Sequence, residues 1–120
     1  MQVGVDITSE QRIKALHAAL RILDKWQFSY SEKATLLGLQ HDREDREEVS
    51  DSTLERISYI LNIHKALRQT FGSDETIYDW VRKANNHPTL SGASAKDYML
   101  SGNECALSKI AKLVIGYSAQ

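Results

Sequence analysis

Proline occurs once in this chain of 120 residues, at Pro88, and only six residues are glycine. Long segments therefore lack the two residue types that most strongly interrupt helices. Within these segments apolar residues recur every three or four positions, which is the period of an amphipathic helix and differs from the alternation of a strand. The pattern predicts an all-α fold, built as a compact helical bundle.

Capping signals divide this helical chain into segments. Thr8 with Gln11, and Ser29 with Glu32, have the spacing of a capping box, in which two side chains satisfy free backbone N–H groups at a helix start. Gly38 suits the left-handed end of a helix. The predicted helices cover residues 8–27, 29–38, 50–72, 73–84, 94–102 and 103–115. The stripe expected to pack inward on the first of them is Ile13, Leu16, Leu20, Leu23 and Gln27, with Trp26 beside it.

The length of the C-terminal part bears on domain organisation. Residues 73–120 span 48 positions, close to the lower limit for a piece of chain that folds alone. We therefore expect them to pack on the long helix before Gly72, or on a partner, so that the chain forms one cooperative unit. Within it we assign residues 1–72 to a helix-turn-helix-like and dimerisation region, and residues 73–120 to a small binding region of three helices.

The short helix, the Gly38 turn and the segment that follows have the order of a helix-turn-helix motif. The same order occurs at ordinary corners of all-helical domains, so both interpretations stay open. Residues 40–48 hold five acidic and two basic side chains, which would meet DNA phosphates largely as repulsion. The net charge of the whole chain, -1, excludes general binding to polyanions. The side chains able to reach bases or phosphates are Gln40, His41, Arg43 and Arg46.

Residues with catalytic or metal-binding chemistry do not gather in a recognised pattern. His41, Asp42 and Asp45 could share a helical face, but no further ligand follows at a fixed spacing, and a solvated charged face explains them. Cys105 has no neighbouring His or Lys that would stabilise a thiolate. The chain also lacks a phosphate-binding glycine loop and the order of a Ser, His and Asp triad. We expect no enzyme activity, no metal site and no cofactor.

A single cysteine and the absence of long apolar runs bear on the compartment. Cys105 cannot form a disulfide within the chain, which favours a reducing environment. No apolar stretch approaches the roughly 20 residues that cross a bilayer, and the N-terminus lacks the features of a signal peptide. We expect a cytoplasmic protein without a membrane span.

The clearest turn signal lies at residues 85–92. Asn, Pro and Gly are concentrated there between two predicted helices, with the apolar Leu90 in the middle. Taken alone, the segment is explained as a helix connection with Pro88 as the breaker.

Around this loop the chain resembles the toxin-binding domain of Xre/MbcA/ParS-type antitoxins, which belong to bacterial toxin–antitoxin modules. The matching positions are a Trp, residues of the loop and a Ser-led helix that ends in Gly: Trp80, Asn85, Pro88, Leu90, Gly92, Ser94, Ala95, Met99 and Gly102. Residues 36–39 and 52–63 resemble the family's Xre-like helix-turn-helix and the helix after it, so the likeness spans about residues 29–114. The chain departs from the pattern at Ala84, where Pro is usual, and at Lys96, where an apolar residue is usual.

This resemblance implies a non-catalytic antitoxin that forms a homodimer, binds a cognate toxin through residues 73–120 and, in many members, represses its own operon. The usual partner is a RES-domain toxin that degrades NAD, and the antitoxin neutralises it by blocking its active site. The toxin-binding residues are then expected to be Trp80, Asn85, Pro88, Leu90, Gly92, Ser94, Tyr98 and Met99. Apolar anchors among them would be Leu90, Tyr98 and Met99. The alternative is a DNA-binding transcriptional regulator whose C-terminal helices only dimerise.

Overall fold

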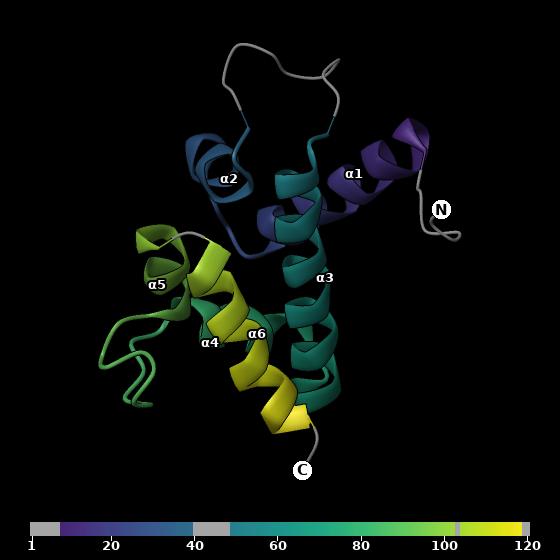
Figure 1. The fold of residues 1–120 in the computed structure, drawn as a ribbon. Coiled ribbons are helices and arrows are strands. Elements are labelled where there is room, and N and C mark those ends of the chain that lie inside the picture. Colours follow the sequence, from purple (N-terminus) through teal and green to yellow (C-terminus); the bar gives the residue numbers. More distant parts are fainter. Residues whose placement is uncertain (1–7, 40–48, 103, 119–120) are drawn as a thin grey trace.

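The computed structural model describes residues 8–39, 49–102 and 104–118. These residues form six helices and no strand, apart from one isolated bridge between Ala84 and Ser94. The helices are α1 (Ser9–Lys25), α2 (Tyr30–Leu37), α3 (Asp51–Phe71), α4 (Asp74–Arg82), α5 (Ala95–Ser101) and α6 (Glu104–Ser118). The prediction of an all-α bundle is confirmed (Figure 1).

Helix α3 is the element around which the others pack. Figure 1 shows α1 and α2 around its first half and α4, α5 and α6 around its second half. Its most extensive packing is with α6, followed by α1. Of the helices after Gly72, α4 and α6 therefore pack on the long helix, as their short combined length predicts, while α5 packs on α6, α4 and α2.

One hydrophobic core runs through both ends of the molecule. Fully buried side chains come from every part of it: Leu23, Trp26, Leu37, Ile57, Ile60, Ile63, Leu67, Ile77, Val81, Met99, Leu107 and Ile110. More than one face of α3 contributes to the core. Ile57, Ile60 and Leu67 are buried, and so are Ile63 and Ala66 on the adjoining face. The boundary between residues 72 and 73 does not divide this core.

Local signals account for the helix ends. The N-caps are Thr8, Ser29, Ser50, Ser73 and Ser94, and the first two form complete capping boxes. Gly38 ends α2 with φ 73°, a left-handed conformation that costs glycine little. These predicted helix starts and this predicted end are confirmed.

The end of α1 differs from the prediction. The helix stops at Lys25, and Gln27 is exposed with φ 66°. Trp26, not Gln27, is the residue buried at this end, followed by Phe28, which is 4% exposed. The turn at Gln27 brings two aromatic side chains into the core within three positions, which an uninterrupted helix could not do.

Among the residues described, no helix combines the length and the apolar character needed to cross a membrane.

Candidate functional site

The loop between α4 and α5 is closed by its own hydrogen bonds. The backbone N–H of Asn85 donates to the carbonyl of Ala93 at 3.1 Å, and that of Gly92 donates to the carbonyl of Asn85 at 2.7 Å. The side-chain oxygen of Asn85 accepts from the backbone N–H of His87 at 2.9 Å. Asn85 therefore holds both ends of the loop, and the segment between them has a defined shape.

Buried side chains fix this loop on the bundle. Leu90 is 3% exposed and belongs to the core, while Ser94 is 7% exposed and caps α5 by accepting from the N–H of Asp97 at 3.0 Å. Gly92 has φ 93°, a conformation that side chains with a Cβ rarely adopt. The loop is therefore a preformed surface element.

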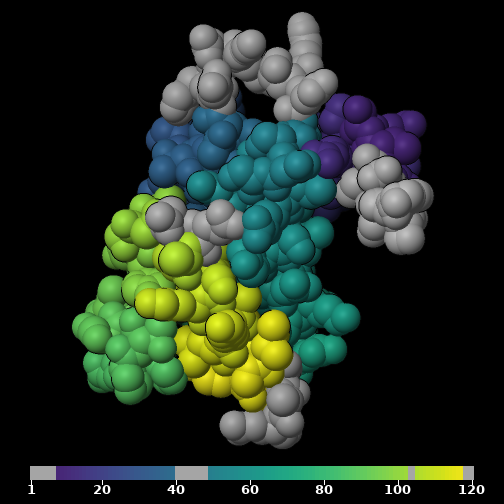
Figure 2. Space-filling model, viewed as in Figure 1, coloured from purple at the N-terminus to yellow at the C-terminus, as the bar shows by residue number. Residues whose placement is uncertain are grey.

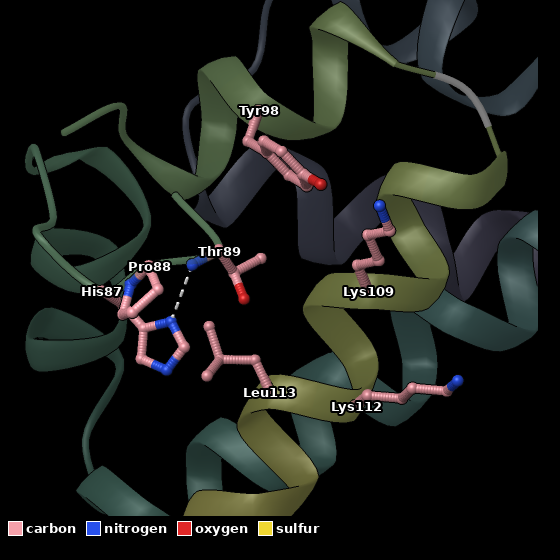
Figure 3. A pocket seen from close by; sticks show the side chains of 7 residues that line it. All are labelled: His87, Pro88, Thr89, Tyr98, Lys109, Lys112 and Leu113. Atoms are coloured by element: carbon pink, nitrogen blue, oxygen red, sulfur yellow. Dashed lines mark hydrogen bonds between the residues drawn. The ribbon is translucent and has the colours of Figure 1, made fainter. Parts of the chain in front are cut away.

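An open groove lies where this loop meets α5 and α6. Its volume is about 600 Å³, and Figure 3 shows the side chains around it. His87 and Pro88 stand on one side and the two lysines of α6 on the other, while the loop and α6 lie on the face of the molecule shown in Figure 2. The lining residues are His87, Pro88, Thr89, Tyr98, Lys109, Lys112 and Leu113.

The chemistry of the groove is basic and rich in hydrogen-bond donors. The segments 83–94 and 105–118, which supply two of its three walls, contain no Asp or Glu. Among the residues that the structure describes, neither Lys109 nor Lys112 has an ion-pair partner. Nδ1 of His87 accepts from the backbone N–H of Thr89 at 3.1 Å, which leaves the other ring nitrogen to carry the proton.

Comparison with known proteins adds one relative. No protein-family model and no solved structure matches the chain. The uncharacterised protein y4oB of Sinorhizobium fredii is 38% identical over 93 residues, which cover 72% of this chain and 70% of y4oB. This chain belongs to the y4oB family.

In this member of the y4oB family, some of the predicted site residues lie together at the groove. Pro88 and Tyr98 line it directly. Asn85, Gly92 and Ser94 do not line it, but they shape the loop that forms one of its walls.

Two of the expected surface anchors are buried in this chain's own core. Leu90 is 3% and Met99 is 1% exposed, so neither side chain can reach a partner in this conformation. In this conformation their contribution to a partner surface is indirect, because the loop and α5 both turn their apolar side toward the bundle, and their role in toxin binding stays a prediction. Trp80 is partly buried and meets Tyr117 edge-on, with ring centroids 6.1 Å apart.

The groove also contains residues that the sequence interpretation missed. They are His87, Thr89, Lys109, Lys112 and Leu113. The available signal was the absence of acidic residues in 83–94 and 105–118, together with the spacing of Lys109 and Lys112 on one side of a helix.

The contacts of Lys96 show how α5 accommodates a charged residue at a position where the antitoxin pattern has an apolar one. Its Nζ lies 3.2 Å from Oε1 of Glu32, 3.4 Å from the carbonyl oxygen of Gln27 and 5.1 Å from the ring centroid of Phe28. The lysine therefore ties α5 to the start of α2 through an ion pair and a cation–π contact.

The residues predicted to contact DNA belong to the part of the chain that the structure does not describe. Gln40, His41, Arg43 and Arg46 lie outside the described residues, as do Asp42 and Asp45. Within the described ranges, no three His, Cys, Asp or Glu side chains come together as a metal site requires.

Proposed function

We propose that this chain is the antitoxin of a type II toxin–antitoxin module, which binds a cognate RES-type, NAD-degrading toxin and blocks its active site. The chain supplies a binding surface and catalyses no reaction. In keeping with the resemblance to Xre/MbcA/ParS-type antitoxins, it acts as a homodimer in the cytoplasm, beside the NAD pool that its toxin attacks.

The observation that carries this proposal is that most of the loop residues that match the antitoxin pattern build one structural element. Five of these residues lie in the connection between α4 and α5. Asn85, Leu90, Gly92 and Ser94 close or anchor it, and the carbonyl of Pro88 accepts a hydrogen bond from the Ser91 hydroxyl at 3.0 Å. A residue pattern that builds one rigid element beside an open groove is expected of a recognition surface, since a preformed surface loses little entropy on binding.

Steric occlusion suits the chemistry of this surface. Pro88 is exposed, Tyr98 is partly exposed, and the groove between them is bordered by N–H, O–H and ammonium donors. Aromatic and apolar groups surrounded by polar ones are typical of protein interfaces. Leu90 and Met99 support this surface from beneath.

The test is co-expression of the chain with the toxin-sized protein encoded by the neighbouring open reading frame. Expression of that protein alone should arrest growth and deplete NAD, and the chain should restore both and co-purify with the toxin. Unrelieved growth arrest without a complex would contradict the proposal.

A second measurement separates the proposal from the transcriptional regulator. Binding of the purified chain to its own promoter fragment is measured across salt concentrations, because phosphate contacts make affinity fall steeply with salt. Steeply salt-dependent promoter binding without toxin capture would favour the regulator.

A further inference from the structure

We propose that the groove between the 85–92 loop and α6 docks an acidic segment of the toxin, with an apolar side chain of that segment seated between the two walls. This inference rests on the proposed function and specifies the partner's chemistry at one surface. It predicts that the toxin has carboxylates that face Lys109 and Lys112 in the complex.

Charge complementarity is the first argument. The chain as a whole is nearly neutral, at -1, yet residues 83–94 and 105–118, which supply the loop wall and the α6 wall, contain no Asp or Glu and carry Lys83, Lys109 and Lys112. Lys109 and Lys112 are exposed, and no described side chain pairs with them. Two neighbouring cations without an acid leave a positive potential that a partner's carboxylates would neutralise.

The floor of the groove supplies the apolar half of the argument. Leu113 and Tyr98 are partly buried and pack against the core, so their exposed surfaces are held in place. In Figure 3 the Leu113 side chain projects between the His87 side and the lysine side of the groove. A floor of this kind favours an apolar side chain with carboxylates next to it over a chain of acidic residues alone.

Hydrogen-bond donors complete the match. His87, Thr89 and Tyr98 line the groove together with the two lysines, and they add the hydroxyls of Thr89 and Tyr98 and the imidazole N–H of His87 as donors. Carboxylates accept hydrogen bonds from all of these donors. None of the described residues that line the groove carries a carboxylate that could bind a basic segment in the same way.

The first experiment measures capture of the neighbouring toxin by two charge-reversal variants of the full chain. The variant Lys109→Glu/Lys112→Glu changes the groove, and the control Lys14→Glu/Lys65→Glu makes the same charge change at exposed positions on α1 and α3. We expect toxin affinity to fall about tenfold or more in the groove variant, with a weaker dependence on salt, and to stay within about twofold in the control. Thermal unfolding of both variants verifies that they are folded.

The second experiment probes the groove without the toxin. The isotope-labelled full chain is titrated with a peptide of four glutamates around one leucine, and amide shifts are followed by NMR. Shifts should concentrate at His87, Thr89, Lys109 and Lys112 and disappear in the groove variant. A peptide with glycine in place of leucine should bind more weakly, and one with lysines in place of glutamates should not bind.

The outcomes separate this inference from the proposed function. Toxin capture that is equally tight in the groove variant overturns the inference and leaves the antitoxin role intact. Peptide binding at the groove without toxin capture removes the antitoxin role and supports the groove's preference for acidic segments. If the chain binds neither the toxin nor the acidic peptide, both the antitoxin role and the groove's preference for acidic segments are overturned.

Discussion

His64 is a histidine placed where protonation opposes folding. It lies partly buried on α3, with its ring centroid 6.4 Å from that of Trp26. Nδ1 of His64 and Nε1 of Trp26 are buried, and neither has a hydrogen-bond partner among the described residues. Burial is the main cause that lowers the pKa of His64, and it is opposed by Asp74 and reinforced by Lys25 and Arg68. The unfolded chain therefore takes up this proton more readily than the folded one.

The free energy of unfolding should fall as pH drops below about 6.5, the ordinary pKa of histidine. The sign follows because the unfolded state binds the proton first, so stability is fully present above 6.5 and is lost toward the lowered pKa of the folded state. Denaturant unfolding between pH 7.5 and 5 measures this slope, and His64→Gln should flatten it. The carboxyl groups of Glu32 and Asp74 also have lowered pKa values, but their stabilising effect is lost only below about 4.5 and 3.8.

The matched control is His17→Gln, which removes an exposed imidazole from α1. Equal flattening in that variant, or an unchanged slope in His64→Gln, would contradict the role of His64.

At the scale of elements, the 85–92 loop needs glycine at position 92 because of its backbone conformation and not because a side chain would collide with its neighbours. A Cβ built at Gly92 would have nothing within 4 Å, yet φ there is 93°. A Cβ built at Gly116 in α6 would also meet nothing within 4 Å, but that position has no left-handed φ. The two glycines therefore separate conformational strain from steric crowding.

Gly92→Ala should lower the free energy of unfolding by about 1–2 kcal/mol, because alanine resists the left-handed conformation. The same substitution at Gly116 should raise it by about 0.5–1 kcal/mol, because alanine favours a helix. Chemical denaturation of the two variants gives both values. Equal effects of the same sign would show that the loop does not impose its conformation on Gly92.

At the scale of the whole molecule, α3 and α6 make the two ends of the chain a single core. Ile110 on α6 and Ile57, Ile60 and Leu67 on α3 are fully buried in it. The chain carries one tryptophan in each half, Trp26 and Trp80, which can report on the two halves separately. Because one core serves both halves, the chain should unfold as one unit.

Ile110→Ala should destabilise the whole chain by about 2–4 kcal/mol through a cavity between α3 and α6. Fluorescence of Trp26, read in a Trp80→Phe background, should shift its unfolding midpoint together with the helical circular dichroism. Ile115→Ala on the same helix, where the side chain is 47% exposed, should change stability by less than about 0.5 kcal/mol. A Trp26 midpoint that stays in place in Ile110→Ala would show two independently folding halves.

Features set by neighbouring residues could be predicted from the sequence. The N-caps at Thr8, Ser29 and Ser94 each bond to a residue three positions on, and the loop at 85–92 follows from its Asn, Pro and Gly content. Within the candidate site, Pro88 and Tyr98 were predicted from the resemblance to Xre/MbcA/ParS-type antitoxins, and both line the groove.

Contacts between distant segments were decided by the tertiary structure alone. Lys109 and Lys112 join Pro88 at the groove only because α6 packs on α3 beside the loop, more than twenty positions away in the chain. Leu90 and Met99 are apolar residues that a surface or a core could use, and only the packing of the 85–92 loop and of α5 turns them inward. Local hydrogen bonds and helix periodicity involve residues only a few positions apart, so they can be predicted from the sequence. The direction in which each helix faces depends on the core that all of them share.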